Sequence, residues 1–257
     1  MRGQAFFILI PKPLIGLMKF WQTEMSMDLT RVPTYVRGLD EQLEGGIPQG
    51  DVILIAGKPG TMKSSLGFNI LWNNAKQSGV PGAYVTLEQS RDSLLVNMAR
   101  LGMPIEGLER NISILDLGMI RKKLTQLTDE TWLEVFKMYV QNLRKNMNIE
   151  LMVIDSLPVL EIMAKFKDPR DDLFHFFEWL RDLGVTTMLI AEMDQDSCHF
   201  SKNGEDFLAD GIIHMDLKRE GNNVNLYTSV VKMRKTAHRR GYYPVIYDRK
   251  GFEIVSE

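Results

Sequence analysis

The sequence is poor in cysteine, with a single residue, Cys198, among its 257 positions. One cysteine cannot form an intramolecular disulfide, and this scarcity fits a reducing compartment, so a cytoplasmic protein is expected. The chain also lacks an excess of either charge, because 31 Lys and Arg residues oppose 33 Asp and Glu residues for a net charge of −2. The global positive field that usually accompanies nucleic-acid binding is therefore missing.

Long uninterrupted apolar runs are lacking too. Two apolar stretches within residues 5–18 are broken by Pro11 and Pro13, and each is too short to cross a membrane. No linker-like composition divides the rest of the chain. We therefore expect no transmembrane segment, an N-terminal appendage outside the core over residues 1–28, and one domain over residues 29–257. A docking arm for a partner or a membrane surface is a second interpretation of the appendage.

Strand-like apolar runs alternate with helical patterns from about Leu29 onward. Continuous apolar runs are typical of strands in a mostly parallel sheet that helices cover on both faces, so an α/β fold is predicted. The predicted strands are Asp51–Ala56, Gly82–Leu87, Ile112–Leu115, Leu151–Asp155, Val185–Ala191, Gly211–Leu217 and Asn225–Met233. The last third of the chain, with turns near Pro244 and Gly251, predicts a C-terminal antiparallel extension. A helix start is predicted at Asp168 with Pro169 in its first turn.

A glycine-rich loop directly follows the first of these runs and leads into a helical pattern. Its residues are Gly57, Lys58, Pro59, Gly60, Thr61, Met62, Lys63, Ser64 and Ser65. In such a P-loop, backbone N–H groups surround the β-phosphate, Lys63 reaches the β- and γ-phosphates, and Ser64 holds Mg²⁺. The sequence therefore predicts a site for ATP and Mg²⁺, and a strand-to-helix turn without a ligand is the alternative.

One position of the loop departs from the usual pattern. Met62 stands where glycine normally precedes the lysine. If the backbone is helical there, methionine costs little. If it needs a positive φ, the strain is on the order of 1 kcal/mol or more.

Three acidic residues stand where such a sheet would place a site, because Glu88, Asp155 and Glu192 each end a strand-like run. Ligands in open α/β sheets bind outside the carboxyl ends of the strands, so these side chains are expected to converge near the phosphate loop. Asp155 after an apolar run matches the Walker B pattern, whose carboxylate holds Mg²⁺ directly or through water. Glu88 is then placed to polarise the water that attacks the γ-phosphate.

A pair of cations forms a second constellation near the end of the chain. Lys232 and Arg234 are two positions apart, so on a strand both side chains project to one face. The residues alone favour a solvated basic hairpin. The other interpretation is that paired cations on a rigid strand clamp a transferring phosphoryl group.

Many short segments of the chain stand in a specific order and spacing. They are Gly38-Leu-Asp, Gly45-Gly46, Pro59-Gly-Thr, Val85-Thr-Leu-Glu, Val153-Ile-Asp-Ser156, Ala209-Asp-Gly-Ile-Ile, Lys232-Met-Arg-Lys-Thr-Ala-His238, Tyr243-Pro and Asp248-Arg-Lys-Gly-Phe-Glu-Ile. In their order and spacing they resemble the KaiC-like branch of the RecA superfamily. The resemblance covers residues 32–255, nearly everything except the appendage.

The resemblance implies a RecA-like P-loop ATPase domain that assembles into a homo-oligomer, commonly a hexameric ring, with ATP at the subunit interfaces. It also implies that Lys232 and Arg234 reach the neighbour's nucleotide. The family usually has two adjacent glutamates after the second strand, and here they are Glu88 and Gln89, of which Gln89 cannot accept a proton. Only one such domain is present, so a clock function does not follow.

The leading hypothesis is thus a slow, Mg²⁺-dependent ATPase that acts as an oligomeric regulatory or assembly switch with an unidentified protein partner. One alternative is a RecA-paralogue ATPase that binds DNA in recombination or repair. Its candidate DNA-binding loop, Asp194–Phe207, is more acidic than basic, which counts against DNA. The other alternative is a nucleotide-sensing scaffold without hydrolysis, which Met62 and Gln89 favour.

Overall fold

The computed structural model describes residues 29–119, 129–194, 199–248 and 250–255. Residues 31–257 form one unit of the chain. The predicted appendage at residues 1–28 lies outside the described part, as does Cys198.

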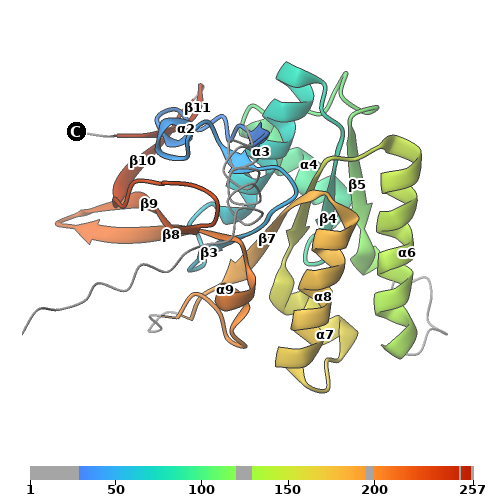
Figure 1. Cartoon of the computed structure of the whole chain (residues 1–257). Coiled ribbons are helices and arrows are strands. Elements are labelled where there is room, and N and C mark those ends of the chain that lie inside the picture. Colours follow the sequence, from blue (N-terminus) through green and yellow to red (C-terminus); the bar gives the residue numbers. More distant parts are fainter. Residues whose placement is uncertain (1–28, 120–128, 195–198, 249, 256–257) are drawn as a thin grey trace, which may run out of the picture. The chain divides into compact units, whose positions relative to one another are not determined.

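A nine-stranded sheet forms the centre of the domain (Figure 1), with the strand order β11-β10-β9-β8-β3-β7-β6-β4-β5. A separate two-stranded sheet pairs β1 with β2. The strands are β1 Arg31–Val32, β2 Ile47–Pro48, β3 Val52–Gly57, β4 Gly82–Thr86, β5 Ile112–Asp116, β6 Leu151–Asp155, β7 Thr186–Glu192, β8 Gly211–Glu220, β9 Asn223–Met233, β10 Tyr243–Asp248 and β11 Gly251–Ile254.

The six strands from β8 to β5 in this order run parallel, as predicted from their continuous apolar runs. β3 lies between β7 and β8, and every one of its residues is buried. Such strands need apolar side chains on both faces, because helices cover both sides of the sheet. The carboxyl ends of β3, β4, β6 and β7 consequently meet along one edge.

Two apolar cores lie on opposite faces of this sheet. On one face, Phe68 and Leu71 of α3 pack with Val153 of β6. On the other, Phe136 of α6 packs with Phe176 of α8. The helices are α2 Leu39–Gln42, α3 Lys63–Ser78, α4 Arg91–Arg100, α6 Asp129–Met147, α7 Leu157–Ala164, α8 Pro169–Leu183 and α9 Glu205–Leu208. Within the described ranges, no helix is both long and apolar enough to cross a membrane.

The predicted start of α8 is confirmed. The Asp168 side chain accepts a hydrogen bond from the backbone N–H of Asp171, and Pro169 is the first helical residue. The helix ends at Gly184, which has a left-handed φ of 67° that glycine adopts without strain.

The predicted antiparallel extension is also confirmed. β8 turns through Gly221 into β9, and β10 and β11 continue the sheet in antiparallel fashion (Figure 1). β8 runs three residues beyond the predicted end at Leu217, because its last residues form an exposed ribbon whose pairing needs no apolar run. The fold class is therefore mixed α/β, with a mostly parallel sheet and C-terminal antiparallel strands.

Candidate nucleotide site

The predicted phosphate loop joins the buried strand β3 to the long helix α3. β3 ends at Gly57, where an added Cβ would lie 2.3 Å from the backbone oxygen of Met215, so only glycine fits. Gly60 has a φ of 82°, and Thr61 closes the turn by donating its hydroxyl to the Lys58 carbonyl at 2.7 Å. The loop is therefore a tight structure whose shape depends on glycine at two points.

Met62 adopts the strained alternative of the two considered from the sequence. Its backbone is left-handed, with φ 62° and ψ 25°, immediately before the first residue of α3. A residue with a Cβ pays roughly 1–2 kcal/mol for this conformation. The Met62 side chain packs against the apolar core on the α3 face.

Lys63 is a buried cation with few partners. Its Nζ donates one hydrogen bond to the Lys58 carbonyl at 3.0 Å. Burial lowers the pKa of Lys63, and nearby Glu192, Asp155 and Glu88 oppose that shift in this order. Among the described residues, no carboxylate forms an ion pair with Nζ. Because a buried charge is costly without compensation, this arrangement suits an incoming anion.

The three strand-end acids converge on Lys63 but differ in exposure. Asp155, the last residue of β6, is buried, whereas Glu88 and Glu192 are exposed. Burial raises the pKa of Asp155, and the hydrogen bond from Tyr84 and the nearby Ser64 side chain oppose the rise. Glu88 and Glu192 are thus accessible to water, while Asp155 lies buried near the start of α3.

Glu88 is held by a neighbouring hydroxyl. The Ser156 side chain, which directly follows Asp155, donates a hydrogen bond to Glu88 Oε1. The side chain of Gln89 instead accepts from Asn97 of α4 at 3.4 Å. The two residues that resemble the family's adjacent glutamates therefore have different partners.

The donors at this end of the sheet fit Mg²⁺ bound together with phosphate. Ser64 and Asp155 offer oxygen ligands, which Mg²⁺ prefers, and it commonly takes only one or two protein ligands while phosphates and water complete its shell. In the described part of the chain, no group of three or more His, Cys, Asp or Glu residues could hold a metal ion alone. A dedicated all-protein metal site is therefore not seen there.

A pocket of about 360 Å³ opens beside the loop hydroxyls. Ser64 and Ser65 line it together with Asn97 and Arg100 of α4. It offers hydroxyl, amide and guanidinium groups next to the start of α3.

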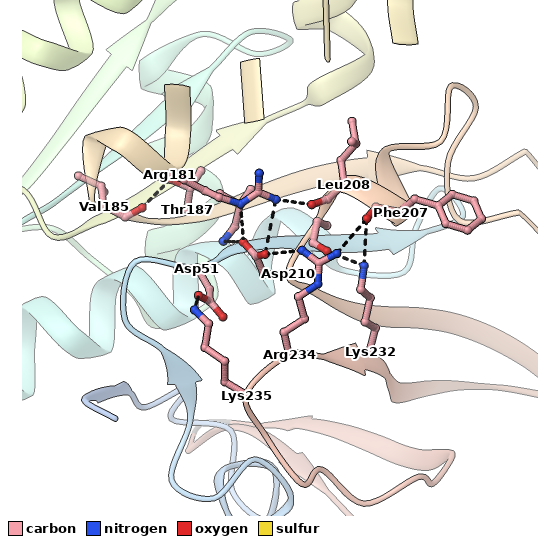
Figure 2. Close-up of polar contacts among 12 residues, drawn as sticks. Asp51, Arg181, Val185, Thr187, Phe207, Leu208, Asp210, Lys232, Arg234 and Lys235 are labelled. Carbon is pink, nitrogen blue, oxygen red and sulfur yellow. Dashed lines mark hydrogen bonds and ion pairs between the residues drawn. The ribbon is translucent and has the colours of Figure 1, made fainter. Parts of the chain in front are cut away.

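Lys232 lies in β9 and Arg234 follows its last residue, and both side chains reach the same carbonyl of their own chain, that of Phe207 (Figure 2). Lys232 Nζ donates to three backbone carbonyls, those of Asp206, Phe207 and Ala209, at 3.0, 3.3 and 2.6 Å. Burial lowers the pKa of Lys232, and the neighbouring Arg234 lowers it further. The interpretation as a freely solvated hairpin therefore does not describe these side chains.

Arg234 joins a network centred on Asp210. Its guanidinium donates to Asp210 Oδ1 at 2.8 Å, while Arg181 of α8 donates to Oδ2 at 3.2 Å. The backbone N–H of Val52 also donates to Oδ2. Burial alone would raise the pKa of Asp210, but these hydrogen bonds bring it below its usual value. Beside this network, Lys235 pairs with buried Asp51 (Figure 2).

This network lies at the opposite end of β3 from the phosphate loop. The Asp210 backbone N–H donates to the Val52 carbonyl at the first residue of β3, whereas the loop follows Gly57 at its last. With a rise of about 3.3 Å per residue, β3 separates the two clusters by about 16 Å. The structure therefore does not bring Lys232 and Arg234 to the P-loop of their own chain.

Sequence reasoning missed Asp51, Arg181 and Asp210 as members of a charge cluster. Asp210 stands in the Ala209-Asp-Gly segment that carries part of the resemblance, which was the one available signal. Arg181 lies 29 positions away from it and shows no local pattern.

Comparison with known proteins relates these features to a family. The KaiC ATPase family model matches residues 32–257. The UPF0273 protein PF1931 of Pyrococcus furiosus is 31% identical over 236 residues, which are 87% of this chain and 93% of that protein. The circadian clock protein KaiC2 of Synechocystis is 28% identical over 233 residues, and the match covers 90% of this chain but only 41% of that protein.

A solved structure supports the same relationship. The KaiC-like protein PH0186 of Pyrococcus horikoshii matches with a TM-score of 0.76 and 29% identity, over 89% of this chain and 100% of that chain. The single KaiC-like domain with a RecA-type fold that the motifs predict is thereby confirmed.

Proposed function

Because this chain belongs to the KaiC ATPase family, we propose that it binds ATP with Mg²⁺ at the loop of residues 57–65 and hydrolyses it slowly to ADP and phosphate. The observation that carries this proposal is Lys63, a buried cation that has one carbonyl partner at the mouth of a glycine-dependent loop. Phosphate oxygens are the anions that such a loop and helix start accept.

The residues around Lys63 divide the chemistry among them. Lys63 neutralises the β- and γ-phosphates, and Ser64 with Asp155 would hold Mg²⁺, which supplies further charge neutralisation when it is bound. Glu88 accepts the proton of the water that attacks the γ-phosphate, with ADP as the leaving group. Its exposure and its hydrogen bond from Ser156 support this role, because a base must meet water in a fixed orientation.

The nucleoside belongs in the pocket beside Ser64 and Ser65. Its Asn97 and Arg100 lining offers hydrogen-bonding groups at the level of the first turn of α3. A triphosphate that ends at Lys63 would place its ribose toward this pocket.

Slow turnover is expected because two residues differ from those usual in the family. Met62 holds a left-handed backbone beside the phosphates, and Gln89 provides no second carboxylate next to Glu88. If hydrolysis is absent altogether, these same residues support the second candidate, a nucleotide-sensing scaffold.

In this proposal, a neighbouring subunit completes the nucleotide site. Lys232 and Arg234 lie about one strand length from their own P-loop, which is why we assign them to a neighbour's nucleotide in a homo-oligomer, a hexameric ring in the family's common form. To reach a phosphate, Arg234 must exchange its hydrogen bonds to Asp210 and Phe207 for new ones. This exchange would couple nucleotide state to subunit contacts, as expected of a cytoplasmic regulatory or assembly switch.

The test is steady-state phosphate release from ATP, with Mg²⁺, for the wild type and for Glu88→Gln, each with and without single-stranded DNA. We expect slow release by the wild type, none above background by Glu88→Gln, and no effect of DNA. Unchanged release by Glu88→Gln would move the base elsewhere, with Glu192 the next candidate. Stimulation by DNA would favour the recombinase alternative, and ATP binding without release would favour the scaffold.

A further inference from the structure

Tyr84 places a phenol hydroxyl inside the core directly beneath the proposed metal ligands. It stands in the middle of β4, opposite Val153 of β6 and Ile114 of β5. Its side chain is 0% exposed, and its ring packs against Phe68 of α3 with 5.6 Å between centroids. An aromatic ring alone would satisfy this packing, so the hydroxyl requires a separate explanation.

The hydroxyl contacts one of the two residues assigned to Mg²⁺. It donates to Asp155 Oδ2 at 2.5 Å, and the Ser64 side chain lies near both groups. A neutral phenol beside a carboxylate is the hydrogen-bond donor of the pair. Tyr84 and Asp155 thus form a buried hydrogen-bonded pair next to the start of α3.

This hydrogen bond fixes the orientation of a buried carboxylate. With Oδ2 engaged by a donor that cannot move within a packed core, Asp155 has one oxygen, Oδ1, left for a metal ion or its water. A rigid donor behind a metal-binding carboxylate is a common way to orient it, and loss of such a partner typically costs 10- to 100-fold in metal affinity or activity.

We propose that Tyr84 is a positioning residue that sets the Mg²⁺ affinity of this site by orienting Asp155 from within the core. The inference rests on the proposed function, since it assumes that ATP and Mg²⁺ bind at the loop. It concerns the metal specifically and leaves the contacts between Lys63 and phosphate unchanged.

The test compares the wild type with Tyr84→Phe, which removes the hydroxyl and keeps the ring. ATP affinity is measured by calorimetry in EDTA and across a series of Mg²⁺ concentrations, and Mn²⁺ binding to the ATP complex is followed by electron paramagnetic resonance. We expect wild-type affinity for ATP in EDTA and an increase of about 10- to 100-fold in the Mg²⁺ concentration that gives half-maximal tightening. Tyr243→Phe is the matched control, because its hydroxyl contacts Gln42 instead, and its Mg²⁺ dependence should equal that of the wild type.

A second variant makes the result decisive. In an Asp155→Asn background the carboxylate is already gone, so adding Tyr84→Phe should change the Mg²⁺ dependence less than about twofold. The inference would be overturned if a folded Tyr84→Phe protein kept the Mg²⁺ dependence of the wild type. It would also be overturned if this variant lost ATP affinity equally with and without metal, or if its effect added fully to that of Asp155→Asn. Wild-type protein that binds no ATP under any condition would overturn the proposed function itself, which distinguishes the two failures.

Discussion

A charged cluster lies at each end of β3, and the two clusters differ in how completely their charged groups are paired. At the carboxyl end, the buried amine of Lys63 has one hydrogen bond to a loop carbonyl, and the three nearby carboxylates form no ion pair with it among the described residues. At the amino end, Asp210 accepts hydrogen bonds from Arg181, Arg234 and a backbone N–H. The amine of Lys63 therefore lacks a counter-anion, while Asp210 already has hydrogen-bond partners on both carboxylate oxygens.

We interpret this difference as one between a proposed binding site and a structural cluster. A buried cation without a counter-charge has a desolvation cost that a phosphate can offset. Removal of one partner from a buried carboxylate–arginine pair destabilises the fold, and these arginines can act on a ligand only after they exchange partners.

Mixed oligomers test whether the satisfied cluster serves a neighbour. Arg234→Ala and Glu88→Gln should each lose turnover, by about 10³-fold or more for the arginine if it acts as a trans arginine finger. Mixtures should recover partial phosphate release, because some interfaces pair an intact Glu88 with an intact Arg234. Wild-type turnover should also rise more than linearly with protein concentration. No recovery at any ratio, with mixing verified by native mass measurement, would confine both residues to one subunit.

Removal of the central carboxylate should destabilise the fold. Asp210→Ala leaves two arginines and the Val52 N–H without their acceptor, and we expect the free energy of unfolding to fall by about 3 kcal/mol, the lower part of the range for a broken buried pair because both arginines can reach water. Urea denaturation measures this. Asp182→Ala, at an exposed position of α8 next to Arg181, serves as control with a much smaller loss. Equal losses would argue that the network contributes little.

A pair of neighbouring carboxyl groups, Glu161 of α7 and Glu205 of α9, should make the stability of the fold depend on pH. Burial raises the pKa of Glu161 to about 8 from 4.5, and Glu205 on the facing α9 adds to the rise, whereas Asn203 and Lys202 oppose it. Between these values the folded chain binds a proton that the unfolded chain has lost, so stability falls as pH rises from about 4.5 to 8.

Glu161→Gln should therefore flatten the stability profile and gain on the order of 1 kcal/mol over the wild type at pH 8.5, after allowance for partial exposure. Melting temperatures across this pH range provide the measurement. Glu106→Gln, at an exposed turn, should keep the wild-type slope. A Glu161→Gln profile as steep as the wild type would exclude this carboxyl as the source of the slope.

The smallest effect concerns the strained loop residue. Met62→Gly and Met62→Ala both lose the side chain, so their difference isolates the left-handed backbone, and the glycine variant should be more stable by about 1 kcal/mol. At exposed Gln77 in α3 the order should reverse, since glycine costs about 1 kcal/mol relative to alanine in a helix. If the alanine variant is more stable than the glycine variant at both positions, Met62 carries no backbone strain.

The loop at the carboxyl end of β3 could be predicted from sequence because its signals are local, and its role in nucleotide binding stays a prediction. A continuous apolar strand, two required glycines and Lys63 fall within a dozen residues, and β6 ends at Asp155 as its apolar run indicates. The parallel order of the sheet follows from the same runs. Met62 shows the limit of such reasoning, because the sequence names the residue but not its φ.

The Asp210 end could not be predicted because its partners are distant in the sequence. Lys235 meets Asp51 across 184 positions, and Arg181 meets Asp210 across 29. Charge spacing predicted that Lys232 and Arg234 point the same way, and both reach the Phe207 carbonyl although Arg234 lies just beyond β9, yet only packing decides which carbonyls they contact. The hydroxyl of Tyr84 was missed for the same reason, since a tyrosine in an apolar run looks like any other core residue.

The measurement that tests the account most directly is an ATP titration, in the presence of Mg²⁺, of the wild type, Lys63→Ala and Lys58→Ala. Removal of Lys63 takes away the buried cation that awaits an anion, so its ATP affinity should fall by about 100-fold or more, near 2.7 kcal/mol. Lys58→Ala should bind nearly as the wild type does, because its contribution to the loop is a backbone carbonyl that the substitution keeps. Wild-type affinity in Lys63→Ala would contradict the assignment of this loop as the nucleotide site.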